Sequence, residues 1–295
     1  MATTALEDYA AIVAVRNPQR RIDTTTFFNL NEGETERSPY DQFLHNSVQL
    51  NKYWALLRPE EEIDPEMGIL LLLGYVSAIE GYMRSLIRRL INCDPFSQKA
   101  CESLQVAYGA VMHHRPESLS DALLEETVFS SGPSIGTALQ KFVGSNPLSG
   151  NTKALVEQYD AICQLRHCCV HRFGKLGAKN ATALGLSRHS QFLEKRVIIR
   201  KAEMIDIADL LFALVKSVNN EVFGFVLKRS ATGRLSEGAS IGLGWTWNVR
   251  QDAARFQKYY AIFMSRNDAP PSPSRREVYE KFRSAHRNVS AQRRS

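Results

Sequence analysis

The chain has 295 residues, long enough for one large domain or for one domain with smaller additions. Hydrophobic residues make up 44% of it and charged residues 23%, close to the values of ordinary soluble globular proteins, so a sizeable core can form. The formal charge of +6 favours anionic partners, nucleic acid among them.

Three classes of protein are disfavoured by the same sequence. The five cysteines are odd in number and three crowd between residues 163 and 169, which is typical of reduced thiols. The first ten residues carry Glu7 and Asp8 and lack the basic-then-apolar order of a signal peptide. The most apolar stretch, residues 67–79, is shorter than the roughly 20 residues that cross a bilayer and runs into Glu80. We therefore expect a soluble cytoplasmic protein without membrane contact.

The predicted elements are helices along most of the chain. Residues 1–37 are mixed in polarity and predict a loosely ordered arm, after which apolar residues recur at spacings of three and four. This periodicity predicts helices over residues 38–57, 67–91, 96–114, 119–128, 134–143, 152–173 and 201–228. Residues 174–195 predict a loop, and a short extended piece at 196–200 is the one hint of a strand. The fold class is therefore all-α.

The chain changes character after residue 228. A linker leads to residues 245–265, which predict a helix with exposed aromatic anchors. The proline-rich residues 268–274 predict a hinge, and the basic residues 275–295 predict a solvated tail. The domain organisation expected is an arm over 1–37, a helical domain over 38–228 and a C-terminal helical extension with a basic tail over 229–295.

The helix predicted over residues 152–173 contains a misplaced charge. Its stripe at positions 155, 159, 162, 166, 169 and 173 is apolar or cysteine except for Arg166. A buried guanidinium without a partner loses several kcal/mol of solvation. Glu80 lies on the apolar stripe of the helix over 67–91, so we expect Glu80 and Arg166 to pair or to share a polar pocket. A structural ion pair in the core is the alternative interpretation.

His171 follows Arg166 by five residues, in the last predicted turn of the same helix. The two residues lie about 140° apart around an ideal helix, so they are not neighbours on one face. They converge if the helix end unwinds or if two copies of the helix meet at a dimer interface. The helix dipole favours the protonated imidazolium at this position.

The stretch RHCCVH, Arg166 to His171, resembles the signature motif of the HEPN superfamily (higher eukaryotes and prokaryotes nucleotide-binding domains). That motif has an arginine, four to six residues of which the first is usually polar, and a histidine near the end of a long helix. His167 takes the polar position. The setting is also similar, with an acid-bearing helix at 75–87 and a closing amphipathic helix at 203–215. The resemblance covers residues 38–228 and implies a helical bundle.

The resemblance implies an endoribonuclease without metal or other cofactor, in which two protomers place their motifs in one cleft. It gives His171 the acid/base role, Arg166 the binding of the scissile phosphate, and His167 the positioning of one of them. Arg172 and Lys175 would bind further RNA phosphates. The products would carry 2′,3′-cyclic phosphate and 5′-hydroxyl ends. A toxin or phage-defence effector, restrained by a regulatory protein partner, is expected by family analogy.

Two other chemistries compete for the same helix. Cys163, His167 and His171 fall at i, i+4 and i+8, within a sector of about 80°, which suits three zinc ligands but leaves the fourth unidentified. Cys168 and Cys169 are candidates for a catalytic thiol, but they lie far from an activating helix N-terminus.

Other segments offer weaker candidate sites. The HHRPE motif at 113–117 is a polar helix end or a site, and GLGWTWN at 242–248 lacks the strand and helix that flank a nucleotide loop. The basic residues 275–295, which include Tyr279 and Phe282, are a tail or a surface for RNA phosphates. A HEPN-like module that binds RNA or protein without cutting is the second class of function.

Overall fold

The computed structural model describes residues 12–14, 16, 18–29, 36–58, 61–113, 119–233 and 242–292. The chain divides into two units, Met1–Glu36 and Arg37–Ser295. The described residues of the first unit are all exposed, and they include a 3-10 turn, η2 (Thr24–Phe27), capped by the side chain of Asp23. The predicted loosely ordered arm, residues 1–37, lies in part outside the described residues.

The all-α prediction is confirmed. The described residues contain twelve α-helices and no strand, and one isolated antiparallel bridge joins Lys175 to Arg196. The helices are α1 (Pro39–Asn51), α2 (Pro65–Cys93), α3 (Pro95–Cys101), α4 (Tyr108–His113), α5 (Leu119–Leu124), α6 (Gly132–Ala138), α7 (Gly150–Arg172), α8 (Ala178–Ala183), α9 (Leu186–His189), α10 (Lys201–Thr232), α11 (Val249–Phe263) and α12 (Arg275–Gln292). A π-helical turn, η4 (Leu139–Val143), continues α6, and a 3-10 turn, η5 (Ser190–Phe192), follows α9.

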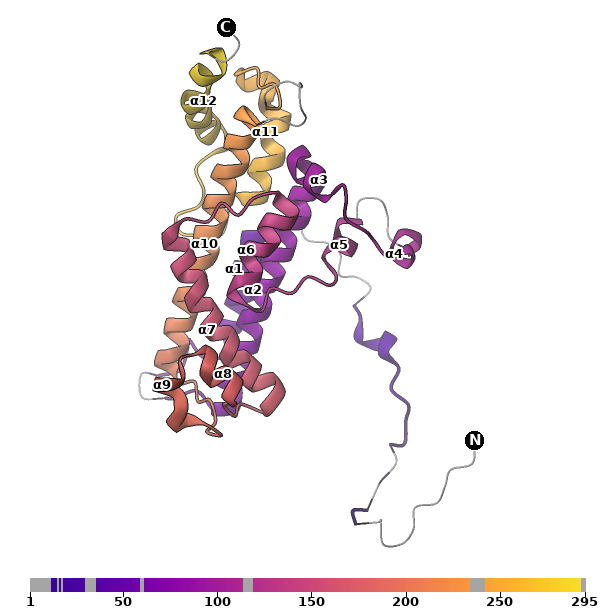
Figure 1. The fold of residues 1–295 in the computed structure, drawn as a ribbon, viewed down its shortest axis with the longest axis vertical. Coiled ribbons are helices and arrows are strands. Elements are labelled where there is room, and N and C mark those ends of the chain that lie inside the picture. Colours follow the sequence, from indigo (N-terminus) through magenta and orange to yellow (C-terminus); the bar gives the residue numbers. More distant parts are fainter. Residues whose placement is uncertain are drawn as a thin grey trace. The chain divides into compact units, whose positions relative to one another are not determined.

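Helices α1, α2, α7 and α10 pack against one another around the core (Figure 1). The last turn of α7 lies beside the first turns of α2 and α10. Gly174 lies against Ile69 of α2, and the backbone N–H of Lys201 at the start of α10 donates to Glu62 just before α2. We call this the lower end of the bundle, with α8 and α9 beside it. The upper end carries α11 and α12 (Figure 1).

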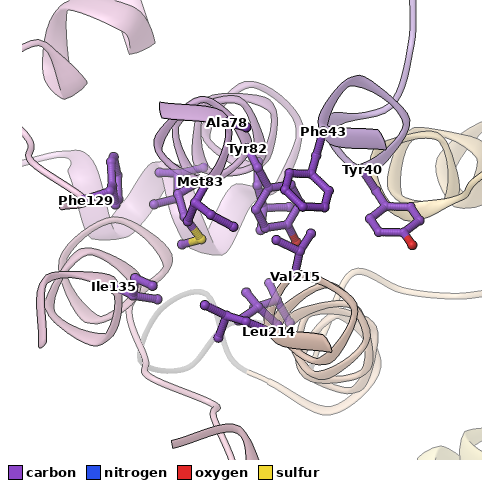
Figure 2. Close-up of a cluster of buried hydrophobic side chains, with 14 of the residues drawn as sticks. Tyr40, Phe43, Ala78, Tyr82, Met83, Phe129, Ile135, Leu214 and Val215 are labelled. Carbon is purple, nitrogen blue, oxygen red and sulfur yellow. The ribbon is translucent and has the colours of Figure 1, made fainter. Parts of the chain in front are cut away.

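The core is built from the apolar stripes of these helices (Figure 2). Phe43 of α1 has its ring centroid 6.3 Å from that of Tyr82 of α2 and 5.2 Å from that of Phe212 of α10. Leu214 and Val215 of α10 face them and are about 1% exposed. Full burial of one such side chain contributes about 1.5–3 kcal/mol, so the periodic stripes determine how the helices pack.

Helices α2 and α10 are long and apolar enough to cross a membrane by length and composition alone. The unbroken apolar run at 67–79 underestimates α2, which has 29 residues. In the structure 50% of the most apolar window of α2 and 44% of that of α10 are buried inside the protein. The core helix of a soluble protein passes the same test of length and composition.

Two predictions about the middle of the chain are wrong in detail. Residues 96–114 form two helices, because the chain turns after the buried Cys101 and Leu104 packs onto the core. The predicted loop at 174–195 contains α8, α9 and η5, and Ala181 and Leu176 cover Cys168 in a small second core. Loop-like composition did not reveal these contacts, because they depend on neighbours that are distant in sequence.

Most aromatic residues after residue 242 are buried, and Trp247 and Tyr260 are half-buried, so the predictions of exposed anchors and of a solvated tail are wrong for them. Trp245, Phe256, Tyr279 and Phe282 are between 1% and 6% exposed and pack ring against ring. They join α11 and α12 to each other, and both helices also contact α10. The boundaries at residues 37 and 228 stay predictions; α10 itself is continuous to Thr232.

Candidate functional site

Helix α7 positions the motif, and both of its ends are fixed. At its start the Ser149 hydroxyl accepts from the N–H of Thr152. The side-chain hydroxyls of Ser149 and Thr152 both donate to the carboxylate of Glu221 on α10. At its end Phe173 has a left-handed backbone (φ 52°), and its N–H and that of Gly174 donate to the carbonyl of Cys168. This termination leaves His171 in the last turn of α7, at the lower end of the bundle.

The structure brings His167 and His171 together. Their ring centroids are 6.1 Å apart, with His167 half-buried and His171 exposed. Burial lowers the pKa of His167 below its ordinary value, and the nearby charges of Arg166, His171 and Lys179 lower it further, while Asp160 opposes them. The lowered pKa favours the neutral form of His167, in which the imidazole can accept a proton.

Arg166 and Glu80 are half-buried, so the expectation of an arginine buried in the apolar stripe is too strong. Among the described residues no hydrogen bond or ion pair joins the two. They share a neighbourhood instead, since both charges act on Tyr159 and Cys163. Burial raises the pKa of Cys163 to about 12. The charge of Glu80 also raises this pKa, and the charge of Arg166 lowers it. The Arg166 guanidinium is therefore left without a carboxylate partner within the described part of the chain.

The predicted stripe also fails at Phe173, whose side chain is 77% exposed. The helix ends at Arg172, so the spacing that placed Phe173 on the buried face no longer applies there. The stripe holds where α7 is regular: Tyr159 is fully buried, and Cys169 is 7% exposed.

The two residues predicted to bind RNA phosphates, Arg172 and Lys175, differ from each other. The Nη2 of Arg172 donates to both carboxylate oxygens of Glu194, at 2.7 and 2.9 Å. Its charge is thus largely compensated within the protein. Lys175 is exposed, and within the described residues it forms no ion pair.

A polar face of α7 carries both histidines and was not predicted. Positions 153, 157, 160, 164, 167 and 171 are spaced four, three, four, three and four, so they share this face. Asp160 accepts from the N–H of Gly132 at 2.8 Å, and Gln164 is held by Asn180 of α8 at 3.0 Å. The spacing of these polar residues is visible in the sequence, but the helix was predicted from its apolar stripe alone.

The competing thiol and metal interpretations gain no support from the described residues. In that part of the chain no three His, Cys, Asp or Glu side chains are arranged to hold a metal ion. Cys168 and Cys169 are buried, and burial raises the pKa of Cys169 to about 11, which keeps the thiol protonated and unreactive.

The two remaining candidate motifs lie elsewhere. Residues 114–118, which hold most of the HHRPE motif, lie outside the described residues. The GLGWTWN segment forms the turn before α11, and its Trp245 belongs to the aromatic cluster at the upper end.

Comparison with protein-family models, with curated proteins and with solved structures finds no match to this chain. The fold defines an all-α protein. The chemistry of its candidate site follows from two imidazoles one helical turn apart and from Arg166, whose charge acts on His167. Because α7 is helical to Arg172, Arg166 and His171 stay on different faces within one protomer. Groups of this kind bind phosphate and transfer protons.

Proposed function

We propose that this protein is a HEPN-like ribonuclease that cuts RNA without a metal ion and acts as a cytoplasmic homodimer. The observation that carries the proposal is the pair of imidazoles of His167 and His171 at the lower end of α7, with the charge of Arg166 acting on His167. We call these three residues the histidine cluster. The two imidazole rings lie 6.1 Å apart, and Arg166 has no carboxylate partner among the described residues. An arginine left in this state is available to bind a phosphate, whereas Arg172 is already bound to Glu194.

The reaction needs two proton transfers, and the cluster supplies groups for both. A neutral histidine takes the proton of the RNA 2′-hydroxyl, and the 2′-oxygen then attacks the adjacent phosphorus. The bond from phosphorus to the 5′-oxygen breaks as that oxygen takes a proton from a protonated histidine. His167, with its lowered pKa, suits the acceptor, and His171, exposed in the last turn of α7, is the second acid/base group. Arg166 stabilises the charge that develops on the phosphate oxygens.

Apolar side chains around the cluster support a dimer in which two copies meet at the lower end. The segments beside the last turn of α7 expose large hydrophobic side chains to solvent. These are Val170, Phe173, Leu186, Phe192, Leu193, Ile198 and Ile205. A two-fold interface here would cover them and place two copies of the motif in one cleft.

The product ends test the proposal. We expect the parent protein, incubated with RNA in EDTA, to generate 2′,3′-cyclic phosphate and 5′-hydroxyl ends, and Arg166→Ala and His171→Ala to abolish them. His45→Ala in α1 and Arg250→Ala in α11 are matched controls, since neither residue belongs to the cluster. Loss of cleavage in EDTA, or equal cleavage by parent and both cluster variants, would contradict the proposal.

The second class of function is distinguished by the same set of proteins. If the protein is a non-catalytic module, the parent and His171→Ala should bind RNA or a partner protein equally well, and both should leave RNA intact. Expression toxicity gives an inexpensive first readout: a ribonuclease predicts that the parent slows growth and that Arg166→Ala and His171→Ala do not.

A further inference from the structure

A groove of about 800 Å³ lies between α7 and the α6–η4 segment. This volume is within the range of about 300–1,000 Å³ that is typical of small-molecule pockets. Pro133, Leu148 and Val156 give the groove apolar walls. Lys153, in the first turn of α7, adds a positive charge at the groove.

Two close contacts hold the walls of the groove in place. The N–H of Gly132 donates to Asp160, and a Cβ at Gly132 would lie 2.5 Å from the carbonyl oxygen of Val156. The side chain of Asn146 lies over Gly136, and its Oδ1 accepts from the N–H of Leu148 at 3.3 Å. Gly132 is therefore required for this close approach, because a Cβ there would meet backbone, whereas a Cβ at Gly136 would meet only the end of the Asn146 side chain.

Hydrogen-bonding groups in the groove have unused capacity. One oxygen of Asp160 accepts from Gly132, and the other has no protein partner among the described residues. Glu157 lines the groove without an ion pair in that part of the chain, and the Nδ2 of Asn146 has no acceptor there. The groove thus offers carboxylate acceptors and an amide donor beside an apolar surface.

The groove is aligned with the histidine cluster. Glu157 and Asp160 belong to the same face of α7 as His167 and His171. Asp160 precedes His167 by seven residues, about 10 Å along the helix axis. Its charge reaches His167, where it opposes the lowering of the pKa. The groove and the histidine cluster therefore lie on one face of α7, with Gln164 and Asn180 of α8 between them.

We propose that this groove holds one nucleotide of the RNA strand and favours bases that carry an exocyclic amino group over uracil. The inference rests on the proposed ribonuclease function and names its sequence preference. Single-stranded RNA is read through the edges of unstacked bases, and carboxylates accept from amino groups such as N4 of cytosine. Uracil has no amino group: the one donor on its Watson–Crick edge, N3–H, lies between two carbonyl oxygens, which would face the carboxylates of Glu157 and Asp160. Lys153 binds a phosphate of the same strand.

Direct binding tests the groove without relying on cleavage. The probes are AMP, CMP, GMP and UMP, titrated into full-length His171→Ala protein and followed by NMR. We expect UMP to bind about tenfold more weakly than the other three, the effect of one charge-assisted hydrogen bond. Thr137→Trp, which fills the groove, should remove binding of all four, while Gln158→Trp on another face of α7 should leave it unchanged.

A charge-matched pair tests the carboxylate. Glu157→Gln should bring the affinity for UMP to within about twofold of the others, because the amide offers a donor to the uracil carbonyls. Glu126→Gln, outside the groove, should keep the preference. Equal binding of all four nucleotides by the His171→Ala protein, or binding that Thr137→Trp leaves unchanged, would overturn the proposal. If the nucleotide preference is observed but the parent protein does not cut RNA, the groove proposal holds and the ribonuclease proposal fails.

Discussion

At the upper end of the bundle the carboxylate of Asp94 is fully buried and both of its oxygens are bonded. Tyr259 donates to one oxygen at 2.9 Å, and the other accepts from the backbone and hydroxyl of Ser97 and from Arg229. At the lower end Arg166 is half-buried and has no carboxylate partner among the described residues. The charge of Asp94 is thus fully bonded within the protein, whereas that of Arg166 is not.

The first kind of charge stabilises the fold, and the second is available to bind a ligand. The Arg229 guanidinium lies 4.9 Å from the ring centroids of both Phe96 and Phe225, and its side chain is only 12% exposed, so most of it is covered by protein and its charge is paired. The histidine cluster is open to solvent through His171, and binding there costs the protein no internal bond. Substitutions at the upper end should therefore change stability, and those at the lower end should change activity.

The largest loss of stability is expected for Asp94→Ala. This change leaves Arg229 buried without its partner, at a cost of about 3–5 kcal/mol, and removes the N-cap of α3, worth about 1 kcal/mol more. Urea unfolding of parent and variant measures the difference. Asp209→Ala, at an exposed position of α10, is the control and should stay within about 0.5 kcal/mol of the parent. A loss below about 1 kcal/mol in Asp94→Ala would show that the pairing of Asp94 with Arg229 does not stabilise the fold.

Two phenylalanines sharpen the comparison. Phe256 is 1% exposed and packs against Trp245, Tyr279 and Phe282, so Phe256→Ala should cost about 3–5 kcal/mol. Phe173 at the lower end is 77% exposed, and Phe173→Ala should leave the unfolding free energy of the monomer nearly unchanged. Sedimentation of the same variants adds a second readout: the proposed dimer predicts weaker self-association for Phe173→Ala. Equal stability losses in both variants would remove the distinction between the two ends.

A smaller effect is expected from the pH dependence of His167. Its pKa is lowered in the folded protein, so below about pH 6.5 the unfolded chain binds more protons than the folded one. The unfolding free energy should therefore fall as the pH drops from about 7.5 to about 5.5, and His167→Gln should reduce this slope. Urea titrations at both pH values measure it. An unchanged slope in His167→Gln would mean that the burial of His167 contributes nothing to the pH dependence.

Periodicity predicted the long helices because each buries a continuous stripe. α2, α7 and α10 begin and end within a few residues of the predicted positions. The same pattern does not say what covers a stripe, and for this reason the burial of Trp245 and Phe282 was missed: their partners lie on α11, α12 and α10. Short helices such as α8 were missed because residues 178–183 owe their conformation to packing on α7.

The candidate site was predictable in part. The motif placed His171 near a helix end, and the structure agrees. The approach of His167 to His171 follows from their i, i+4 spacing. The lowered pKa of His167 depends also on Lys179, whose position beside the motif is set by the packing of α8 on α7. The groove beside Asp160 depends on the π-helical turn η4 and on the close approach of Gly132 to α7, and neither has a signal in the sequence.

The rate of RNA cleavage by His171→Ala, measured in EDTA beside the parent and the His45→Ala control, tests the central claim most directly. Removing an acid/base group should lower the rate by about 10²–10⁴-fold while the urea midpoint of the variant stays at that of the parent. A His171→Ala protein that cuts RNA as fast as the parent, or a parent that does not cut RNA, would contradict the assignment of the lower end as a ribonuclease site.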